Sequence, residues 1–424
     1  MKANEWISAL QQGTLEKMGL YTDVKAARER YVKAIESFTK LYGEDRELYV
    51  FSVPGRTEVQ GNHTDHQHGR VLAAAIDRDL IAVAAKNASP VIRIKSEGFP
   101  EDTVSLSPVP ASDAVLKYSS RALVAGTAAC FASRGYEIGG FDAYTTSQVL
   151  KGSGISSSAA FEVMVGNMLS HLYNGGEIPN EELAKIAQYA ENEYFGKPCG
   201  LMDQMACAVG GFVFIDFEDP KAPVIRPIPF SLKDAGYALC IVNTGGNHAD
   251  LNEDYASVPM EMKKIAAYFG KDVLRGITLG DIVGNIPVLR AAAGDRAVLR
   301  AIHFITENDR VLITAGYLEE GNLSAFLGTV LDSGNSSFRF LQNVYTTKNA
   351  AEQGLSLALA VTENYLGGKE CAWRVHGGGF AGTVQAFVKK EYVENYAMLM
   401  NSVFGEGACM VLNIREAGAI QIEL

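Results

Sequence analysis

Apolar positions recur with helical spacing in two parts of the chain. Up to about residue 45, a polar background contains apolar residues at helical intervals: Ala26, Tyr31, Ala34, Ile35 and Phe38. This spacing predicts a helix with one buried face. Residues 179–195 show the same spacing and are followed by Gly196 and Pro198, so a second helix is predicted to end there.

Short apolar runs predict strands. Residues 48–53, 71–76 and 80–85 are three such runs, and they predict a sheet around the polar segment that follows the first run. Two more runs, 210–217 and 237–244, come after the second helix and are followed by long helical stretches. This order of elements indicates a mixed α+β chain with two domains, residues 1–215 and 216–424.

Composition excludes several classes of partner. Of the 424 residues, 47% are hydrophobic and 21% are charged, which is typical of a globular protein large enough for more than one core. The net charge of −11 argues against a nucleic acid partner, because such binding depends on clustered Lys and Arg side chains. No apolar run approaches the roughly 20 residues of a membrane helix, so no membrane partner is expected.

The N-terminal residues and the cysteines indicate the cytoplasm. The sequence MKANEWISALQQG lacks the apolar core of a signal peptide. The 6 cysteines are scattered without a CxxC pair, which fits reduced core thiols better than a disulfide framework or a zinc site. A cytoplasmic location is therefore expected.

Residues 55–69, GRTEVQGNHTDHQHG, gather polar side chains next to predicted strands. Such a mixture of carboxylates, imidazoles and amides suits a polyhydroxylated ligand, whose hydroxyl groups need both donors and acceptors. The same segment contains His63, Asp65, His66 and His68, which are all metal-ligand types, so a metal centre is an alternative. A solvated loop without a ligand is the third interpretation.

Residues 150–163, LKGSGISSSAAFEV, indicate a glycine turn that leads into a helix. Glycine lets the backbone approach phosphate oxygens closely, and the unpaired N–H groups of a helix N-terminus attract anions. The segment lacks the Gly-Lys-Ser/Thr of a Walker A loop and the third glycine of the dinucleotide fingerprint. A phosphate-binding loop is predicted here, with a simple capped helix as the alternative.

Two further segments carry candidate chemistry. Glu191 lies near the end of the second predicted helix, and Asp203 lies in the first turn of the next helix, where the helix dipole favours an ionised carboxylate. Such a carboxylate suits a general base or a metal ligand. Residues 373–388 contain consecutive glycines at 377–379, which indicate close approach to another backbone or to a ligand.

In order and spacing, these segments resemble the superfamily of galactokinase, homoserine kinase, mevalonate kinase and phosphomevalonate kinase, and within it galactokinase. The galactokinase signature GRVNLIGEHTDYNGG is similar to residues 55–69, the superfamily's phosphate loop to residues 152–159, and its CGIMDQ to the CGLMDQ at 199–204. Arg374 and the glycines at 377–382 resemble the C-terminal glycine-rich motif. The resemblance implies an N-terminal mixed-sheet domain like ribosomal S5 domain 2 and a C-terminal ferredoxin-like α+β domain.

The resemblance also implies ATP-dependent phosphorylation of the anomeric hydroxyl of galactose or a galactose-like sugar, by a protein expected to be a monomer. It implies Asp203 as the catalytic base with Arg56 beside it, and Mg²⁺ held by Ser158 and Glu191. The residues implied to bind the phosphates of ATP are Gly152, Ser153, Gly154, Ser156, Ser157 and Ser158. Those implied to bind the sugar are Asn62, His63, Asp65, Gly200, Asp203 and Tyr255.

Three positions depart from the galactokinase pattern. Glu58, Asn62 and His66 stand where the family usually has Asn, Glu and Tyr. An amide in place of a carboxylate adds a donor and so favours a different pattern of hydroxyl groups. A kinase for a modified sugar, such as galacturonate or N-acetylgalactosamine, is therefore one alternative. A non-catalytic sugar and ATP sensor of the same fold, and a metal-dependent hydrolase that uses residues 63–68, are the others.

Overall fold

Two compact units make up the chain, and both are discontinuous in sequence. The computed structural model describes residues 1–149, 154–197, 199–246 and 251–423. The first unit is Met1–Arg56, Ala75–Gly211 and Arg415–Leu424, and the second is Thr57–Ala74 and Phe212–Ile414. The crossing after Gly211 lies close to the boundary expected at residue 215. Residues 57–74 belong to the second unit although they precede residue 215, and residues 415–424 belong to the first unit although they follow it.

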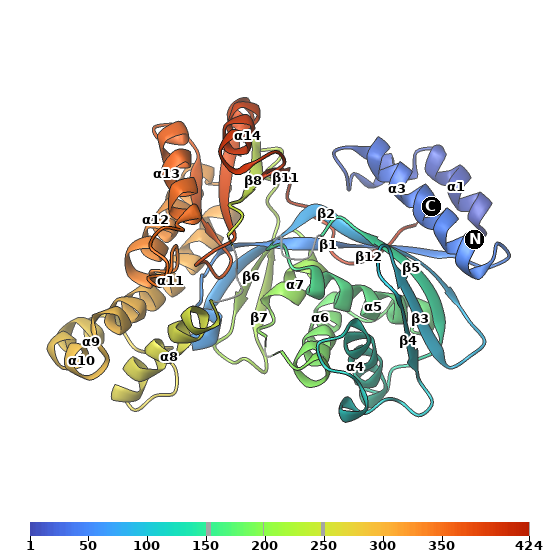
Figure 1. The fold of residues 1–424 in the computed structure, drawn as a ribbon, viewed down its shortest axis with the longest axis horizontal. Coiled ribbons are helices and arrows are strands. Elements are labelled where there is room, and N and C mark those ends of the chain that lie inside the picture. The colour runs from blue at the N-terminus through green and yellow to red at the C-terminus, as the bar shows by residue number, and fades with distance from the viewer. Residues whose placement is uncertain (150–153, 198, 247–250, 424) are drawn as a thin grey trace. The chain divides into compact units, whose positions relative to one another are not determined.

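The first unit is built on a mixed sheet (Figure 1). Its strands lie in the order β12 (Ile420–Gln421), β1 (Tyr49–Gln60), β2 (Arg70–Lys86), β5 (Phe141–Ser147), β3 (Val91–Ser96) and β4 (Glu101–Ser105). β2 pairs antiparallel with β5, and β5 pairs parallel with β3. The C-terminal segment adds the edge strand, where Gln421 lies opposite Phe51. The C-terminal segment therefore belongs to the same sheet as β1.

Helices cover both faces of this sheet (Figure 1). One face carries α1 (Ala3–Gln11), α2 (Thr14–Met18) and α3 (Val24–Tyr42), and the other carries α4 (Ser120–Ser133), α5 (Ser157–Tyr173), α6 (Asn180–Tyr189) and α7 (Met202–Val209). Neighbouring residues of β1 point to opposite faces, as the period of a strand requires. Val50 packs in the core with α3, and the ring of Phe51 lies 5.7 Å from that of His171 on α5.

The two helical regions expected from the sequence are present with local corrections. The buried face of α3 consists of Ala27, Tyr31, Ala34, Ile35 and Phe38, so Ala27 rather than Ala26 faces the core. The N-terminal stretch forms three helices because Gly13 and Gly19 take left-handed conformations on either side of α2. Residues 179–195 form α6 and then a π-helical turn, η3 (Ala190–Phe195), which ends at Gly196. Pro198 lies outside the described residues.

Residues 71–76 and 80–85, expected as separate strands, form the single long strand β2. The polar residues between them do not interrupt the strand, because Asp79 is fully buried and has partners for both carboxylate oxygens. A buried carboxylate that is paired in this way remains compatible with a strand interior. The polar residues 77–79 therefore do not mark a break between two strands.

The partners of Asp79 come from three separate parts of the first unit. Arg30 of α3 donates to its Oδ1 at 2.8 Å, Ser52 of β1 donates to its Oδ2 at 2.6 Å, and Tyr21 donates to the same oxygen. Arg415, which is 3% exposed, lies 3.3 Å from Asp79 Oδ2. Burial alone would raise the pKa of Asp79, but the charges of the two arginines outweigh it and hold that pKa below its usual value. The network thus ties the N-terminal helices, the sheet and the C-terminal segment to one charge.

The second unit contains a four-stranded antiparallel sheet in the order β11 (Cys409–Leu412), β8 (Tyr237–Asn243), β10 (Thr383–Lys389) and β9 (Ala372–His376). The first residues of β2 pair with β6 (Phe212–Asp216), which pairs with β7 (Val224–Ile228). The helical elements are η1 (Asp65–Gln67), α8 (Asn252–Tyr268), α9 (Leu279–Gly284), α10 (Ile286–Ala293), α11 (Asp295–Glu319), α12 (Leu323–Ser336), η4 (Ser337–Leu341), α13 (Gly354–Leu366) and α14 (Lys390–Phe404). The mixed α+β class expected from the sequence is confirmed.

Among the described residues, no helix combines the length and the apolar character that crossing a membrane requires.

Replacing Arg415 by Met should destabilise the first unit by about 3 kcal/mol, because it leaves a buried carboxylate with one arginine fewer. Urea unfolding in a Trp373→Phe background would measure the loss, since Trp6 then reports on the first unit alone. Lys33→Met is the control: its pair with Glu97 is exposed, and its loss should change the stability little. Equal effects of the two substitutions would show that the Asp79 network contributes nothing special.

Candidate active site

The first unit holds a bidentate ion pair between Arg56 and Asp203. Arg56 Nε donates to Asp203 Oδ1 at 2.7 Å, and Nη2 donates to Oδ2 at 2.8 Å. The remaining nitrogen, Nη1, donates to the backbone oxygen of Gly154 at 2.7 Å. The Arg56 side chain is 10% exposed and that of Asp203 is 34% exposed. The carboxylate is therefore held in one orientation while part of it stays accessible.

Local backbone geometry brings these groups together. Arg56 is the last residue of β1 that belongs to the first unit. Its N–H donates to the oxygen of Ile155. A Cβ on Gly55 would lie 2.8 Å from that oxygen, so the close approach requires glycine. Ser156 has a left-handed φ of 63° and its hydroxyl donates to Asp203. A serine in this conformation costs free energy that the surrounding contacts must offset, a pattern that is frequent at functional sites.

The environment of Asp203 keeps its carboxyl group ionised. Burial alone would raise its pKa, but the charge of Arg56 and the hydrogen bonds from Arg56 and Ser156 outweigh burial and lower the pKa below its usual value. The carboxylate lies in the first turn of α7, where the helix dipole also favours an anion. An ionised, oriented and accessible carboxylate can accept a proton.

The predicted phosphate loop lies directly before α5. Gly154 has a φ of 75°, Ser156 is the residue before the helix, and Ser157 and Ser158 are in its first turn. No acidic side chain lies in this first turn, so the helix N-terminus offers unopposed N–H groups to an anion. Gly152 and Ser153, also predicted to bind phosphate, lie outside the described residues.

Glu191 lies in a buried cluster behind this loop. Gln204 Nε2 donates to Glu191 Oε2 at 2.7 Å and to Glu162 Oε2 at 3.2 Å. Burial, and then the charge of Glu191, raise the pKa of Glu162 well above its usual value. Ser158 precedes Glu162 by four residues on α5 and so lies on the same helix face, one turn nearer the N-terminus.

The second unit holds a separate polar cluster around Asn62, which is fully buried. Asn62 Nδ2 donates to Glu58 Oε1 and to the oxygen of Gly377, both at 2.7 Å. Its Oδ1 accepts from Asn343 Nδ2 at 2.6 Å, and its backbone oxygen is 3.0 Å from His303 Nε2. Both amide hydrogens of Asn62 are thus donated within the protein. These contacts hold the segment around Asn62 in position.

His63 and Tyr255 reach the same glycine turn. His63 Nε2 lies 2.9 Å from the oxygen of Gly378, and Tyr255 Oη donates to the oxygen of Gly379 at 2.8 Å. Burial lowers the pKa of His63 to about 4, with the neighbouring His66 as a second cause, so the ring is neutral. Because a carbonyl oxygen only accepts, Nε2 carries the proton of this neutral ring and Nδ1 is an acceptor.

Gly378 and Gly379 are explained by these contacts. A Cβ on Gly378 would lie 2.8 Å from the Tyr255 ring, and a Cβ on Gly379 would lie 2.0 Å from the oxygen of Asn343. The turn therefore approaches both a side chain and another backbone more closely than any other residue type permits. The close approach expected from the sequence is present, and its partners are protein groups.

The polar residues after His63 lie in and beside the short helix η1. Asp65 caps the turn of η1 by accepting from the N–H of His66 at 2.9 Å. The His66 side chain is 47% exposed, and its Nε2 lies 3.7 Å from Asp65 Oδ1. Among the described residues, no group of three or more His, Cys, Asp or Glu side chains is arranged to hold a metal ion. Sugar binding by Asp65 and His63 stays a prediction: Asp65 offers a carboxylate and His63 offers the acceptor nitrogen Nδ1.

Sequence reasoning missed several residues that organise these sites. Gln204 belongs to the CGLMDQ motif and directly follows Asp203, which was a usable signal. Asn343 and His303 gave no signal, because they are separated from Asn62 by 281 and 241 residues. Gly200, predicted to contact the sugar, lies exposed in the loop before α7.

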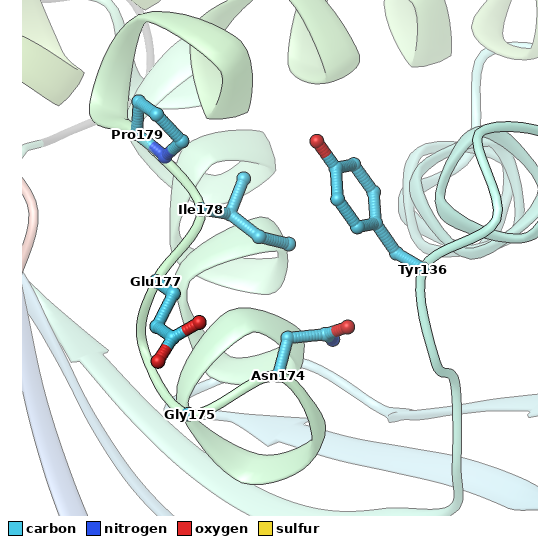
Figure 2. Close-up of a pocket in the computed structure, with 6 residues that line it drawn as sticks. All are labelled: Tyr136, Asn174, Gly175, Glu177, Ile178 and Pro179. Atoms are coloured by element: carbon cyan, nitrogen blue, oxygen red, sulfur yellow. The ribbon is translucent and has the colours of Figure 1, made fainter.

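A hollow of about 520 Å³ lies elsewhere in the first unit, lined by Tyr136, Asn174, Gly175, Glu177, Ile178 and Pro179 (Figure 2). It lies at the C-terminal end of α5, about 25 Å along the helix from Ser157 by the rise per residue. The Asn174 amide is bonded to the backbone of Glu137 and to the oxygen of Leu169. The hollow is therefore separate from the Arg56–Asp203 pair.

Comparison with known proteins first defines the class. The family model described as "GHMP kinases N terminal domain" matches residues 122–211, which include the loop before α5, Glu191 and Asp203. The family model described as "Galactokinase galactose-binding signature" matches residues 36–86, which include Arg56 and the Asn62 cluster. The class that these matches define is the GHMP kinases.

Relatives that span the chain are more specific. The galactokinase of Streptomyces coelicolor is 31% identical over 390 residues, which cover 90% of this chain and 95% of that protein. The galactokinase of Clostridium tetani is 27% identical over 361 residues, or 85% and 88% of the two chains. The crystal structure of Lactococcus lactis galactokinase complexed with galactose has a TM-score of 0.75 at 23% identity, covering 91% of this chain and 98% of that one. This chain belongs to the galactokinase family.

Replacing Asn62 by Asp should destabilise the second unit by roughly 2–4 kcal/mol, because two donor contacts become contacts between acceptors. A double variant with Glu58→Gln should recover about 1 kcal/mol or more, since the new amide can donate to the new carboxylate. Urea unfolding in a Trp6→Phe background, read by Trp373 in β9, would measure both effects.

The matched control is Asn349→Asp, where the side-chain oxygen only accepts a hydrogen bond from Ala351, so little change is expected. The interpretation of the Asn62 contacts would be wrong if Asn62→Asp were as stable as this control.

Proposed function

We propose that this protein transfers the γ-phosphoryl group of ATP to the anomeric C1 hydroxyl of galactose or a closely similar sugar. The observation that carries the proposal is the bidentate pair of Arg56 and Asp203, which holds an ionised and accessible carboxylate beside the N-terminus of α5. Membership of the galactokinase family supports the choice of sugar and of ATP. The products are the sugar 1-phosphate and ADP.

In the proposed mechanism, Asp203 accepts the proton of the C1 hydroxyl. The sugar oxygen forms a bond to the γ-phosphorus, and the bond from that phosphorus to the bridging oxygen of ADP breaks. Arg56 keeps Asp203 ionised and oriented before the reaction, as its two hydrogen bonds support. Its charge also offsets the negative charge of the transferring phosphoryl group.

The phosphates of ATP are proposed to bind at the start of α5, through the N–H groups of its first turn and the hydroxyls of Ser156, Ser157 and Ser158. Ser158 and Glu191 are proposed to hold Mg²⁺, and the donor set fits this ion because a hydroxyl and a carboxylate are hard oxygen ligands. The ammonium of Lys197 already lies 3.4 Å from Glu191 Oε1, so this oxygen accommodates a cation. Bound Mg²⁺ would neutralise charge on the β- and γ-phosphates.

In the second unit, His63 through Nδ1, Asp65 through its carboxylate and Tyr255 are proposed to bind the sugar; in the first unit, Gly200 is the proposed sugar contact. Acceptors of this kind suit the hydroxyl groups of a hexose. Asn62 is assigned to positioning His63 rather than to the sugar, because both of its amide hydrogens are taken by the protein. We further propose a monomer in the cytoplasm, where ATP is supplied and where the free thiols of all 6 cysteines stay reduced.

A second candidate is a kinase for a modified sugar such as galacturonate or N-acetylgalactosamine. The observation that favours it is His66, which stands where the family usually has Tyr and whose side chain is 47% exposed. An imidazole can donate to a carboxylate or an acetamide oxygen, whereas the buried amide of Asn62 has no free donor. His66 is therefore the residue on which this alternative depends.

Coupled ADP-release assays with galactose, galacturonate, N-acetylgalactosamine, arabinose and glucose would test both candidates. Galactose should have the highest kcat/KM if the first is correct, and one of the two modified sugars if the second is. Asp203→Asn should lower kcat by roughly 10²–10⁴-fold because proton acceptance is lost, while binding of the sugar and of an ATP analogue, measured by calorimetry, is retained. Sugar-dependent binding without ADP release from the unmodified protein would instead establish a sensor.

The pH profile provides a further test of the ion pair. Because Arg56 lowers the pKa of Asp203, the unmodified enzyme should keep its kcat/KM down to pH values near or below the ordinary pKa of Asp. In Arg56→Met, burial acts on Asp203 without the arginine's charge, so the acid limb should move to higher pH. The measurement is kcat/KM against pH at constant excess Mg²⁺, each variant scaled to its own plateau.

Arg70→Met is the control for this profile, because its partner is Asp216 in the second unit. An acid limb that shifts equally in both variants, or in neither, would contradict the assignment of Asp203 as the base.

A further inference from the structure

The two carboxylate oxygens of Glu191 have different partners. Oε2 accepts from Gln204 Nε2 at 2.7 Å, and both side chains are buried, with Gln204 at 0% and Glu191 at 3% exposure. Oε1 accepts from Lys197 Nζ at 3.4 Å, and the Lys197 side chain is 62% exposed. Charged hydrogen bonds are normally 2.7–2.9 Å long, so the lysine contact is loose. One oxygen is fixed by the core and the other is held by a cation that water can replace.

The main chain of Lys197 is held by hydrogen bonds, whereas most of its side chain is exposed. The N–H groups of Gly196 and Lys197 both donate to the backbone oxygen of Glu191, at 3.0 and 3.2 Å. Gly196 ends the π-helical turn η3 with a φ of 88°. The Lys197 ammonium can therefore move only within the reach of its own four-carbon chain, about a fixed point beside Glu191.

The carboxylates of Glu191 and Asp203 both interact electrostatically with Lys197. Lys197 Nζ lies 3.4 Å from Glu191 Oε1, and Lys197 precedes α7, whose first turn carries Asp203. Arg56, the other cation close to Asp203, is committed to that carboxylate by two hydrogen bonds. Lys197 could therefore bind a polyanionic ligand at the start of α5 by breaking one contact, its 3.4 Å contact with Glu191 Oε1.

We propose that Lys197 is an exchangeable counterion, which neutralises Glu191 in the nucleotide-free protein and turns to the phosphate oxygens of ATP when a divalent cation takes Glu191 Oε1. Gln204 retains Oε2 throughout and so keeps the carboxylate aimed at the cation. The exchange keeps the buried Glu191 paired in both states, which avoids the cost of an isolated buried charge. The proposal rests on the proposed function, because it requires a nucleotide and a divalent cation at this site.

Lys197→Met, which keeps the length of the side chain without its charge, tests the exchange in the full-length protein. Electron paramagnetic resonance would measure Mn²⁺ binding to the nucleotide-free protein, and calorimetry in EDTA would measure binding of a nonhydrolysable ATP analogue without metal. Mn²⁺ should bind roughly two- to fivefold more tightly to the variant, because its competitor is gone, and the analogue roughly two- to fivefold more weakly. Lys197→Arg should stay near the unmodified protein in both measurements.

Lys33→Met is the matched control, since Lys33 also pairs with a glutamate in the first unit, and it should change neither affinity. The proposal is overturned if Lys197→Met leaves either affinity unchanged, or if it weakens both, which would mean that Lys197 only shapes the loop. Failure of the unmodified protein to bind the analogue at all would contradict the proposed function itself, and this inference with it.

Discussion

The first unit is organised around the hydrogen-bonded ion pair of Arg56 and Asp203. Arg56 uses three nitrogens, two for the carboxylate and one for the oxygen of Gly154, so a single side chain joins β1, α7 and the loop before α5. Such an arrangement is possible only where β1 carries no side chain at position 55, because the loop passes too close. The left-handed Ser156 adds a third donor to the same carboxylate. The hydrogen bonds from Arg56 and Ser156 therefore both orient Asp203 and favour its ionised form.

The second unit follows a different constraint, the need to pair the buried side chain of Asn62. Asn62 cannot remain buried unless its amide finds acceptors, and it finds them in Glu58 and in the glycine turn at 377–379. That turn approaches Tyr255 and Asn343 so closely that side chains are excluded. Gly378 and Gly379 are therefore a consequence of this packing.

The fold class and the order of the chemical segments could be predicted from the sequence because both depend on local patterns. Apolar periodicity marks α3, and the motif at 199–204 places Asp203 in the first turn of a helix. The pairing of distant residues could not be predicted in this way. Asn343 reaches Asn62 across 281 residues, and Arg415 returns to Asp79 across 336 residues. The long strand β2 was missed for the same reason, since the partners of Asp79 lie in other elements.

The exchange at positions 58 and 62 illustrates how structure changes the meaning of a sequence difference. Taken singly, Glu58 and Asn62 are two departures from the family pattern of Asn and Glu. Because Asn62 Nδ2 donates to Glu58 Oε1 at 2.7 Å, they form one amide–carboxylate pair whose members have been interchanged. Glu58 carries the charge of this pair and lies 3.8 Å from the fully buried Arg374. The two departures are therefore linked by a direct contact, so a change at one position alters the hydrogen bonding of the other.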